Sequence, residues 1–226
     1  MPASRSQDLS PTPSSKQLIL LWVGMNTLGF AIATPLSLIR QLSALYFFGP
    51  LFLAGLIVGA VVGPLQAVCL RQTFPKIKPW QWIAANILGS YVGSWLGLFA
   101  NGGLLAIGPA LFNSWFRSGG ALQFGPLIVF AVYGLVIGLF VGLGQVLVLR
   151  NHAQGLRQWW LANLLGRALG WFSGGALGWV LSQYYELSGL SLLAWSILLG
   201  ALGGGVYAGV TAKALLNLKS HPLKKV

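Results

Sequence analysis

A two-part motif occurs three times along the chain and constrains its fold more than any other feature. In the first part, Trp is followed by Asn after four residues, by Gly after three more and by a small residue after another four. In the second part, three small residues four apart precede a polar residue and then Leu. The first part stands at Trp22–Asn26–Gly29–Ala33, Trp82–Asn86–Gly89–Gly93 and Trp159–Asn163–Gly166–Gly170, and the second at Gly55–Gly59–Gly63–Gln66–Leu70, Gly134–Gly138–Gly142–Gln145–Leu149 and Gly200–Gly204–Ala208–Thr211–Leu215. Spacings of three and four keep residues on one helical face, so the sequence predicts three tandem helical hairpins.

The composition places these hairpins in a membrane. The chain is 56% hydrophobic and 7% charged, whereas a soluble domain has about 25% charged residues. Six apolar stretches are each long enough to cross the hydrocarbon core. We expect an all-α bundle of six transmembrane helices at 17–38, 48–70, 80–100, 125–149, 158–182 and 192–216.

The order of the helices predicts the symmetry of the bundle. The three copies span approximately 17–71, 80–150 and 158–216, and each hairpin returns the chain to the side on which it began. Three hairpins in one orientation predict a pseudo-threefold axis along the membrane normal, which is a parallel-repeat architecture. We expect one transmembrane domain over 17–218, a disordered tail over 1–16 with no cleaved signal peptide, and a basic tail over 219–226.

Basic residues are distributed unequally between the two sides of the predicted bundle. Arg40 and Arg117 fall on one side and Arg167 lies inside a helix, whereas the opposite side holds Arg5, Lys16, Arg71, Lys76, Lys78, Arg150, Arg157, Lys213, Lys219, Lys224 and Lys225. Short loops rich in Lys and Arg stay cytoplasmic, so both termini are predicted to face the cytoplasm. The same residues would attract anionic lipid headgroups. Nucleic-acid binding is not expected, because the charge is spread over short segments without a recognisable module.

Aromatic residues near the helix ends predict two interfacial belts. The cytoplasmic belt would contain Trp22, Trp80, Trp82, Trp159 and Trp160, and the opposite belt Trp115, Trp179, Trp195, Tyr46, Tyr184 and Tyr185. A ligand cage at Trp159 and Trp160 is the alternative.

The polar residues of the motif predict a layer of hydrogen-bonding side chains about 8–9 Å inside the cytoplasmic boundary, at 1.5 Å rise per residue. An amide left without a partner in hydrocarbon costs several kcal/mol, so these groups should bond across helices. Two roles stay open, interhelical contacts and the lining of a ligand site. The layer consists of Asn26, Asn86, Asn163, Gln66, Gln145 and Thr211.

Small residues of the motif should allow close helix packing, because lipid offers no hydrophobic drive for helix association. The predicted packing glycines are Gly55, Gly59, Gly63, Gly89, Gly93, Gly134, Gly138, Gly142, Gly166, Gly170, Gly200 and Gly204.

Two features depart from the repeat. Arg167 takes the place of Ser90 in the second copy and Phe30 in the first. A charge at this depth is costly and is often functional, so Arg167 is either a structural or lipid contact that reaches toward headgroups, or part of an anion site. The segment 101–125 is too apolar for an ordinary loop and rich in Gly and Pro, and we expect a short interfacial or re-entrant helix around 104–116.

Side chains for catalysis or metal binding are scarce. The only acidic residues are Asp8 and Glu186, the histidines are His152 and His221, and the single cysteine is Cys69. We therefore expect no catalytic residue, no metal site and no enzyme activity. No cofactor is predicted; bound lipid is expected, and a pigment or quinone remains an alternative.

The repeated residues also suggest a family. The pattern Gly-x3-Gly-x2-Gln-x3-Leu-Arg at 59–71 and 138–150, followed by WIAANILG at 82–89 and WWLANLLG at 159–166, resembles a group of multi-pass membrane proteins common in cyanobacteria. This resemblance covers most of the chain after residue 17 and implies a plasma or thylakoid membrane, but it implies no activity. The third copy departs from the pattern, with Thr211 in place of Gln and Leu216 in place of Arg.

Three functions are compatible with these features. The first is a structural, accessory or assembly subunit that packs against other membrane proteins or lipids. The second is a carrier or substrate-binding subunit for a neutral or anionic small solute, which requires a solvated cavity lined by the polar layer. The third is a pigment- or quinone-binding protein, which the absence of a histidine inside the predicted spans disfavours.

Overall fold

The computed structural model describes residues 14–37, 50–111, 120–185 and 188–220, so the expected tails lie almost entirely outside the described residues. Over these ranges the chain forms six helices and one pair of two-residue strands. The elements are α1 (Ser15–Ser37), α2 (Pro50–Thr73), α3 (Pro79–Leu111), α5 (Gly120–Leu149), β1 (Ala153–Gln154), α6 (Leu156–Tyr184), α7 (Gly189–Asn217) and β2 (Lys219–Ser220).

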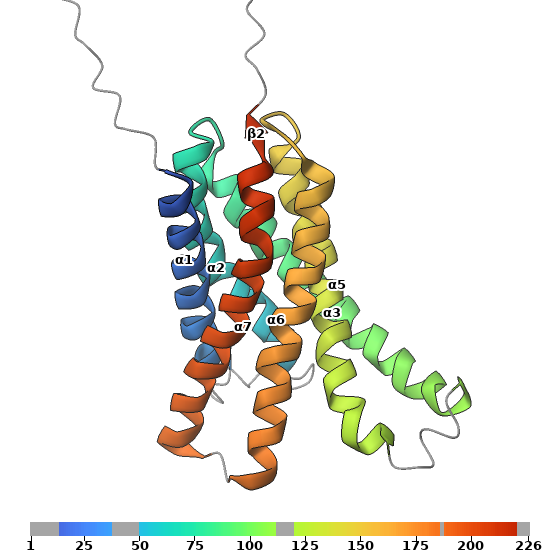
Figure 1. Ribbon diagram of the computed structural model, residues 1–226. Coiled ribbons are helices and arrows are strands. Elements are labelled where there is room, and N and C mark those ends of the chain that lie inside the picture. Colours follow the sequence, from blue (N-terminus) through green and yellow to red (C-terminus); the bar gives the residue numbers. More distant parts are fainter. Residues whose placement is uncertain (1–13, 38–49, 112–119, 186–187, 221–226) are drawn as a thin grey trace, which may run out of the picture.

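The helices form a closed ring. Each helix packs mainly against its neighbours in the chain, and α7 packs against α1 to complete the circle. The start of α1, the α2–α3 and α5–α6 connections, and the end of α7 lie together at one end, which we call the basic end (Figure 1).

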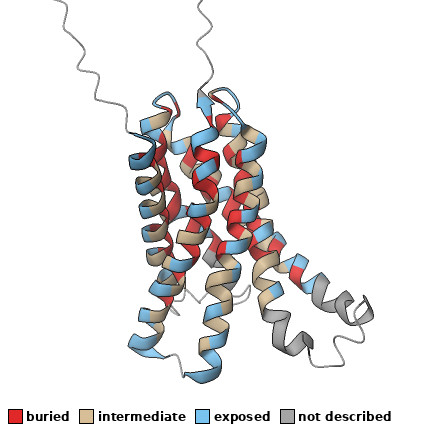
Figure 2. Cartoon of the chain, in the orientation of Figure 1, coloured by how far each residue is buried: buried red, intermediate tan, exposed pale blue. Residues whose placement is uncertain are grey.

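Burial divides each helix into an inner and an outer face (Figure 2). The outer faces carry exposed large apolar side chains such as Leu28, Leu88 and Leu165, as expected for surfaces that meet lipid. Five of the six described helices contain a segment long and apolar enough to cross a membrane. The chain is therefore an all-helical, multi-pass integral membrane protein.

The remaining helix, α6, does not meet this criterion of length and apolar character. It carries Arg157, Asn163 and Arg167 among its apolar residues. Asn163 and Arg167 are buried inside the ring, whereas Arg157 is exposed at the start of the helix.

Glycines allow three equivalent close approaches between neighbouring helices. A Cβ atom added to Gly59 on α2 would lie 2.6 Å from the carbonyl oxygen of Asn86 on α3. The corresponding distances are 2.7 Å from Gly138 on α5 to Asn163 O on α6, and 2.7 Å from Gly204 on α7 to Asn26 O on α1. The contact that closes the ring thus repeats the two contacts that join successive copies.

The expectation for 104–116 is wrong as far as the structure describes it. The helix α3 continues to Leu111 without a break, and residues 112–119 lie outside the described ranges. The ends of α3 and α5 in this region extend away from the rest of the bundle (Figure 1). Gly102 and Gly103 cost helix stability, about 1 kcal/mol each, but they do not end the helix.

The basic end carries a contact that the sequence did not predict. β1, in the α5–α6 connection, pairs antiparallel with β2, directly after α7, with Ala153 opposite Ser220 and Gln154 opposite Lys219. This pairing joins the α5–α6 connection to the segment after α7, outside the helices. Eight basic side chains are exposed at this end, namely Lys16, Arg71, Lys76, Lys78, Arg150, Arg157, Lys213 and Lys219.

Candidate functional site

The asparagines of the three copies adopt the same conformation inside the ring. In each copy the Asn side-chain nitrogen donates to the carbonyl oxygen of the Trp four residues earlier, at 2.8 Å for Asn26, 3.0 Å for Asn86 and 3.0 Å for Asn163. This local bond uses one amide proton and fixes the orientation of the side chain. The oxygen Oδ1 is thereby left free to accept from another helix.

Hydrogen bonds from the second helix of a copy reach back to the Asn of the same copy. Gln66 Nε2 donates to Asn26 Oδ1 at 2.7 Å, and Gln145 Nε2 donates to Asn86 Oδ1 at 3.2 Å. In the third copy Thr211 is too short to take this role, and the hydroxyl of Tyr207 donates to Asn163 Oδ1 at 2.8 Å instead. Tyr207 therefore compensates for the departure of the third copy from the motif.

The indole nitrogens of the motif tryptophans join one copy to another. Trp82 Nε1 donates to Gln66 Oε1 at 3.3 Å, and Trp159 Nε1 donates to Gln145 Oε1 at 3.0 Å. Trp22 Nε1 donates to Thr211 Oγ1 at 2.9 Å across the α1–α7 contact. All three bonds run from the first helix of a copy to the second helix of the copy before it in the ring.

Two further contacts connect these bonds into one network. Gln145 Nε2 lies 3.3 Å from Gln66 Oε1, and Gln66 Nε2 lies 3.4 Å from the Tyr207 hydroxyl. The structure thus brings together all six residues of the predicted polar layer, and each of them is fully buried. Their hydrogen bonds are made to each other, to the motif tryptophans, to Tyr207 and, from Thr211, to the carbonyl oxygen of Ala208.

The motif tryptophans lie inside the bundle rather than at the membrane interface. Trp22, Trp82 and Trp159 have 0% of their surface exposed. The ring centroids of Trp22 and Trp159 lie 5.6 Å apart, and those of Trp82 and Trp159 lie 6.1 Å apart. The assignment of these three residues to a cytoplasmic belt is therefore wrong, whereas Trp80 is exposed as a belt residue should be. The alternative of a ligand cage at Trp159 and Trp160 stays a prediction.

Arg167 lies one helical turn beyond Asn163 and is also fully buried. Its guanidinium carbon lies 4.6 Å from the centroid of the Tyr207 ring and 4.9 Å from that of the Phe30 ring. None of its three nitrogens donates a well-formed hydrogen bond to another described residue. The guanidinium of Arg167 thus lies inside the ring between Phe30 and Tyr207, and its two predicted roles, a structural or lipid contact and an anion site, stay open.

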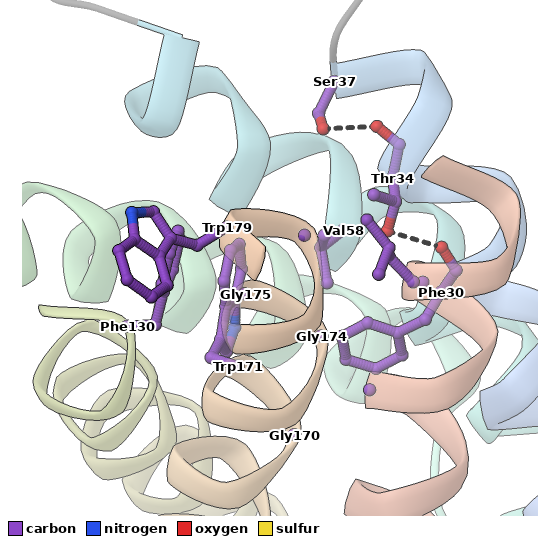
Figure 3. A pocket seen from close by; sticks show the side chains of 14 residues that line it. Phe30, Thr34, Ser37, Val58, Phe130, Gly170, Trp171, Gly174, Gly175 and Trp179 are labelled. Atoms are coloured by element: carbon purple, nitrogen blue, oxygen red, sulfur yellow. Dashed lines mark hydrogen bonds between the residues drawn. The ribbon is translucent and has the colours of Figure 1, made fainter. Parts of the chain in front are cut away.

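A cavity of about 310 Å³ is lined by residues that follow Arg167 on α6 and Asn26 on α1, on the side of the ring away from the basic end. Figure 3 shows the side chains that line this cavity. Its walls come from α1, α2, α5, α6 and α7 and are almost wholly apolar, with Phe30, Val58, Phe130, Trp171, Trp179 and Leu199 as the large side chains. The hydroxyls of Thr34 and Ser37 also line it, and both donate to backbone carbonyls of α1. The polar layer does not contribute to its lining.

The described residues bring no three His, Cys, Asp or Glu side chains together. Cys69 is a buried free thiol of α2, and within the described ranges no acidic residue occurs.

Comparisons with protein-family models, with curated proteins and with solved structures give no match for this chain.

Proposed function

We propose that this chain is a non-catalytic integral membrane protein that acts as a structural, accessory or assembly subunit. The observation that carries the proposal is the internal polar layer, in which amide, hydroxyl and indole groups from all three copies bond to one another while fully buried. Such a layer holds six helices together and leaves no polar group free to act on a substrate. The outer faces, which are apolar on every side, are the surfaces available to lipids and to other membrane proteins.

The proposal includes α6 as a sixth span and a pseudo-threefold ring. The support for the span is the inward placement of Asn163 and Arg167, because residues that face protein do not have to be apolar. The support for the symmetry is the repetition of the same Gly–Asn, Asn–Trp and Trp–polar contacts in three copies. Both termini are proposed to face the cytoplasm, where exposed Lys and Arg at the basic end would contact anionic headgroups. A cyanobacterial plasma or thylakoid membrane is the proposed location.

A carrier for a neutral or anionic solute is less well supported. It would need a solvated path through the polar layer, and the buried rings of Trp22, Trp82 and Trp159 fill the bundle at that level. A pigment or quinone bound at the polar layer would need free polar partners, and the amides there are engaged with each other.

The accessory role is testable with three equivalent residues. Leu28, Leu88 and Leu165 each stand two residues after the motif Asn and are 50%, 62% and 52% exposed. A photo-crosslinking amino acid at each position samples one face of the ring. Association with a partner predicts a protein adduct, identified by mass spectrometry, from one or two of the three positions in native membranes.

Two controls distinguish the outcomes. The photo-crosslinking amino acid in place of Val62, which is buried, should give no intermolecular adduct. Lipid adducts alone from all three outward positions would contradict the role of a subunit in a larger assembly.

A further inference from the structure

The positive charge of Arg167 is not balanced within the described protein. An arginine keeps its charge in proteins, and a buried charge is costly unless it is paired. The two flanking rings stabilise it in part, because a desolvated cation–π contact contributes about 2 kcal/mol. The described ranges contain no acidic side chain, and Nε, Nη1 and Nη2 of Arg167 all lack a hydrogen-bond acceptor.

The apolar cavity begins next to this charge. The ring of Phe30 lines the cavity and also lies against the guanidinium, 4.9 Å from centroid to Cζ. Gly170 and Trp171, on the helical turn of α6 that follows Arg167, line the cavity as well. A rotation of the Phe30 side chain would therefore connect the guanidinium with the cavity.

The unpaired polar groups near the cavity are donors. The indole nitrogen of Trp171 is buried without a partner, as are the nitrogens of Arg167, and the protons of Thr34 and Ser37 are already donated to the backbone. A fitting ligand would have an apolar body for the walls and a head group that accepts hydrogen bonds and carries negative charge.

We propose that this cavity binds a single-chain amphiphile with an anionic head group, and that Arg167 binds the head group. A volume of about 310 Å³ is at the lower end of the range of ligand pockets and is compatible with one acyl chain. The site requires that the chain lies in a membrane, but it does not require the accessory role, and a failure of the crosslinking test would leave it unaffected.

The test measures binding of hexadecanoate and hexadecanol to the full chain in mild detergent, at a pH at which the acid is ionised. Brominated analogues of the two ligands report binding because bromine quenches the fluorescence of Trp171 and Trp179. Charge-assisted hydrogen bonds predict that the acid binds about 10- to 100-fold more tightly than the alcohol. Equal affinities in the wild-type protein overturn the proposal, whether or not any variant folds.

Variants locate the two parts of the site. Arg167→Gln should remove the preference for the acid, and Val58→Phe, which fills the cavity, should weaken both ligands. Leu56→Phe, on the exposed side of the same helix, is the matched control and should bind as the wild type does. A retained acid preference in Arg167→Gln, or wild-type binding in Val58→Phe, overturns the assignment.

Two more ligands distinguish sources of the anion. Hexadecyl phosphate should bind like hexadecanoate, because the guanidinium accepts either head group. Acetate and inorganic phosphate should neither quench the fluorescence of Trp171 and Trp179 nor raise the thermal stability of the protein. If these small anions stabilise the protein as much as hexadecanoate does, the cavity is a site for small anions, and the proposal of an amphiphile site is overturned.

Discussion

Replacing Gly138 by Ala tests the close helix contact between α5 and α6. The new methyl group would lie 2.7 Å from Asn163 O and 2.8 Å from Leu164 Cα, and both atoms belong to a backbone that cannot turn aside. Overpacking of this kind costs about 1–3 kcal/mol. The intrinsic helix propensity of Ala offsets about 0.8–1.0 kcal/mol of that cost, so we expect a net loss of about 0–2 kcal/mol in the free energy of unfolding.

The matched control is Gly209→Ala on α7. A Cβ at Gly209 would meet no atom within 4 Å, so only the propensity term remains and the variant should gain about 1 kcal/mol. The difference between the two variants, about 1–3 kcal/mol, is the quantity to measure, by reversible unfolding in mixed micelles followed by circular dichroism. Gly59→Ala and Gly204→Ala should behave like Gly138→Ala, because the corresponding distances are 2.6 and 2.7 Å. Equal stabilities of Gly138→Ala and Gly209→Ala would refute the reasoning.

Three further predictions concern the polar layer and the orientation. Tyr207→Phe removes the donor to Asn163 Oδ1 and should lower the free energy of unfolding by about 0.6–1.7 kcal/mol. Adding Thr211→Gln to this variant should recover part of the loss. No recovery would contradict the view that Tyr207 replaces the missing Gln. Gln145→Leu removes the side-chain oxygen that accepts from Trp159 Nε1 and the nitrogen that donates to Asn86 Oδ1. It should lower the free energy of unfolding by about 1–3 kcal/mol in the same assay. A stability equal to that of the wild type would show that the polar layer is not needed for packing. The variants Lys76→Cys and Lys219→Cys should both react with a membrane-impermeant maleimide added on the cytoplasmic side, and the buried Cys69 should not react. Labelling of the two variants from opposite sides would contradict the placement of both positions at the basic end.

The spacing of the motif was sufficient to predict which residues meet inside the bundle. Asn26, Asn86 and Asn163 are on the same helical faces as the packing glycines, and the structure brings all of them to the inside of the ring. The same spacing also places Trp22, Trp82 and Trp159 on that face. Their positions near the helix ends suggested a belt, but a side chain four residues before an inward Asn faces inward too.

Other features were not readable from the pattern. Tyr207 occupies the position of Val62 and Val141, and only the loss of Gln in the third copy marks it as different. The cavity is lined by Gly170, Gly174, Gly200 and Gly203, although a Cβ added to each of them would lie 3.0 Å or less from a backbone carbonyl oxygen of the facing helix. The motif does not show where glycines in such close contact also border a cavity. The β1–β2 pairing depends on how two distant connections meet at the basic end, which local sequence does not encode.

The central claim is that three copies close into a ring with a pseudo-threefold axis. Spin labels at Leu28, Leu88 and Leu165, attached in pairs through cysteines in a Cys69→Ala background, would test it by pulsed electron paramagnetic resonance in lipid nanodiscs. The three residues are equivalent and outward-facing, so the three distance distributions should coincide within the width set by the label rotamers. One pair clearly more distant than the other two would show an open or linear arrangement and contradict the account.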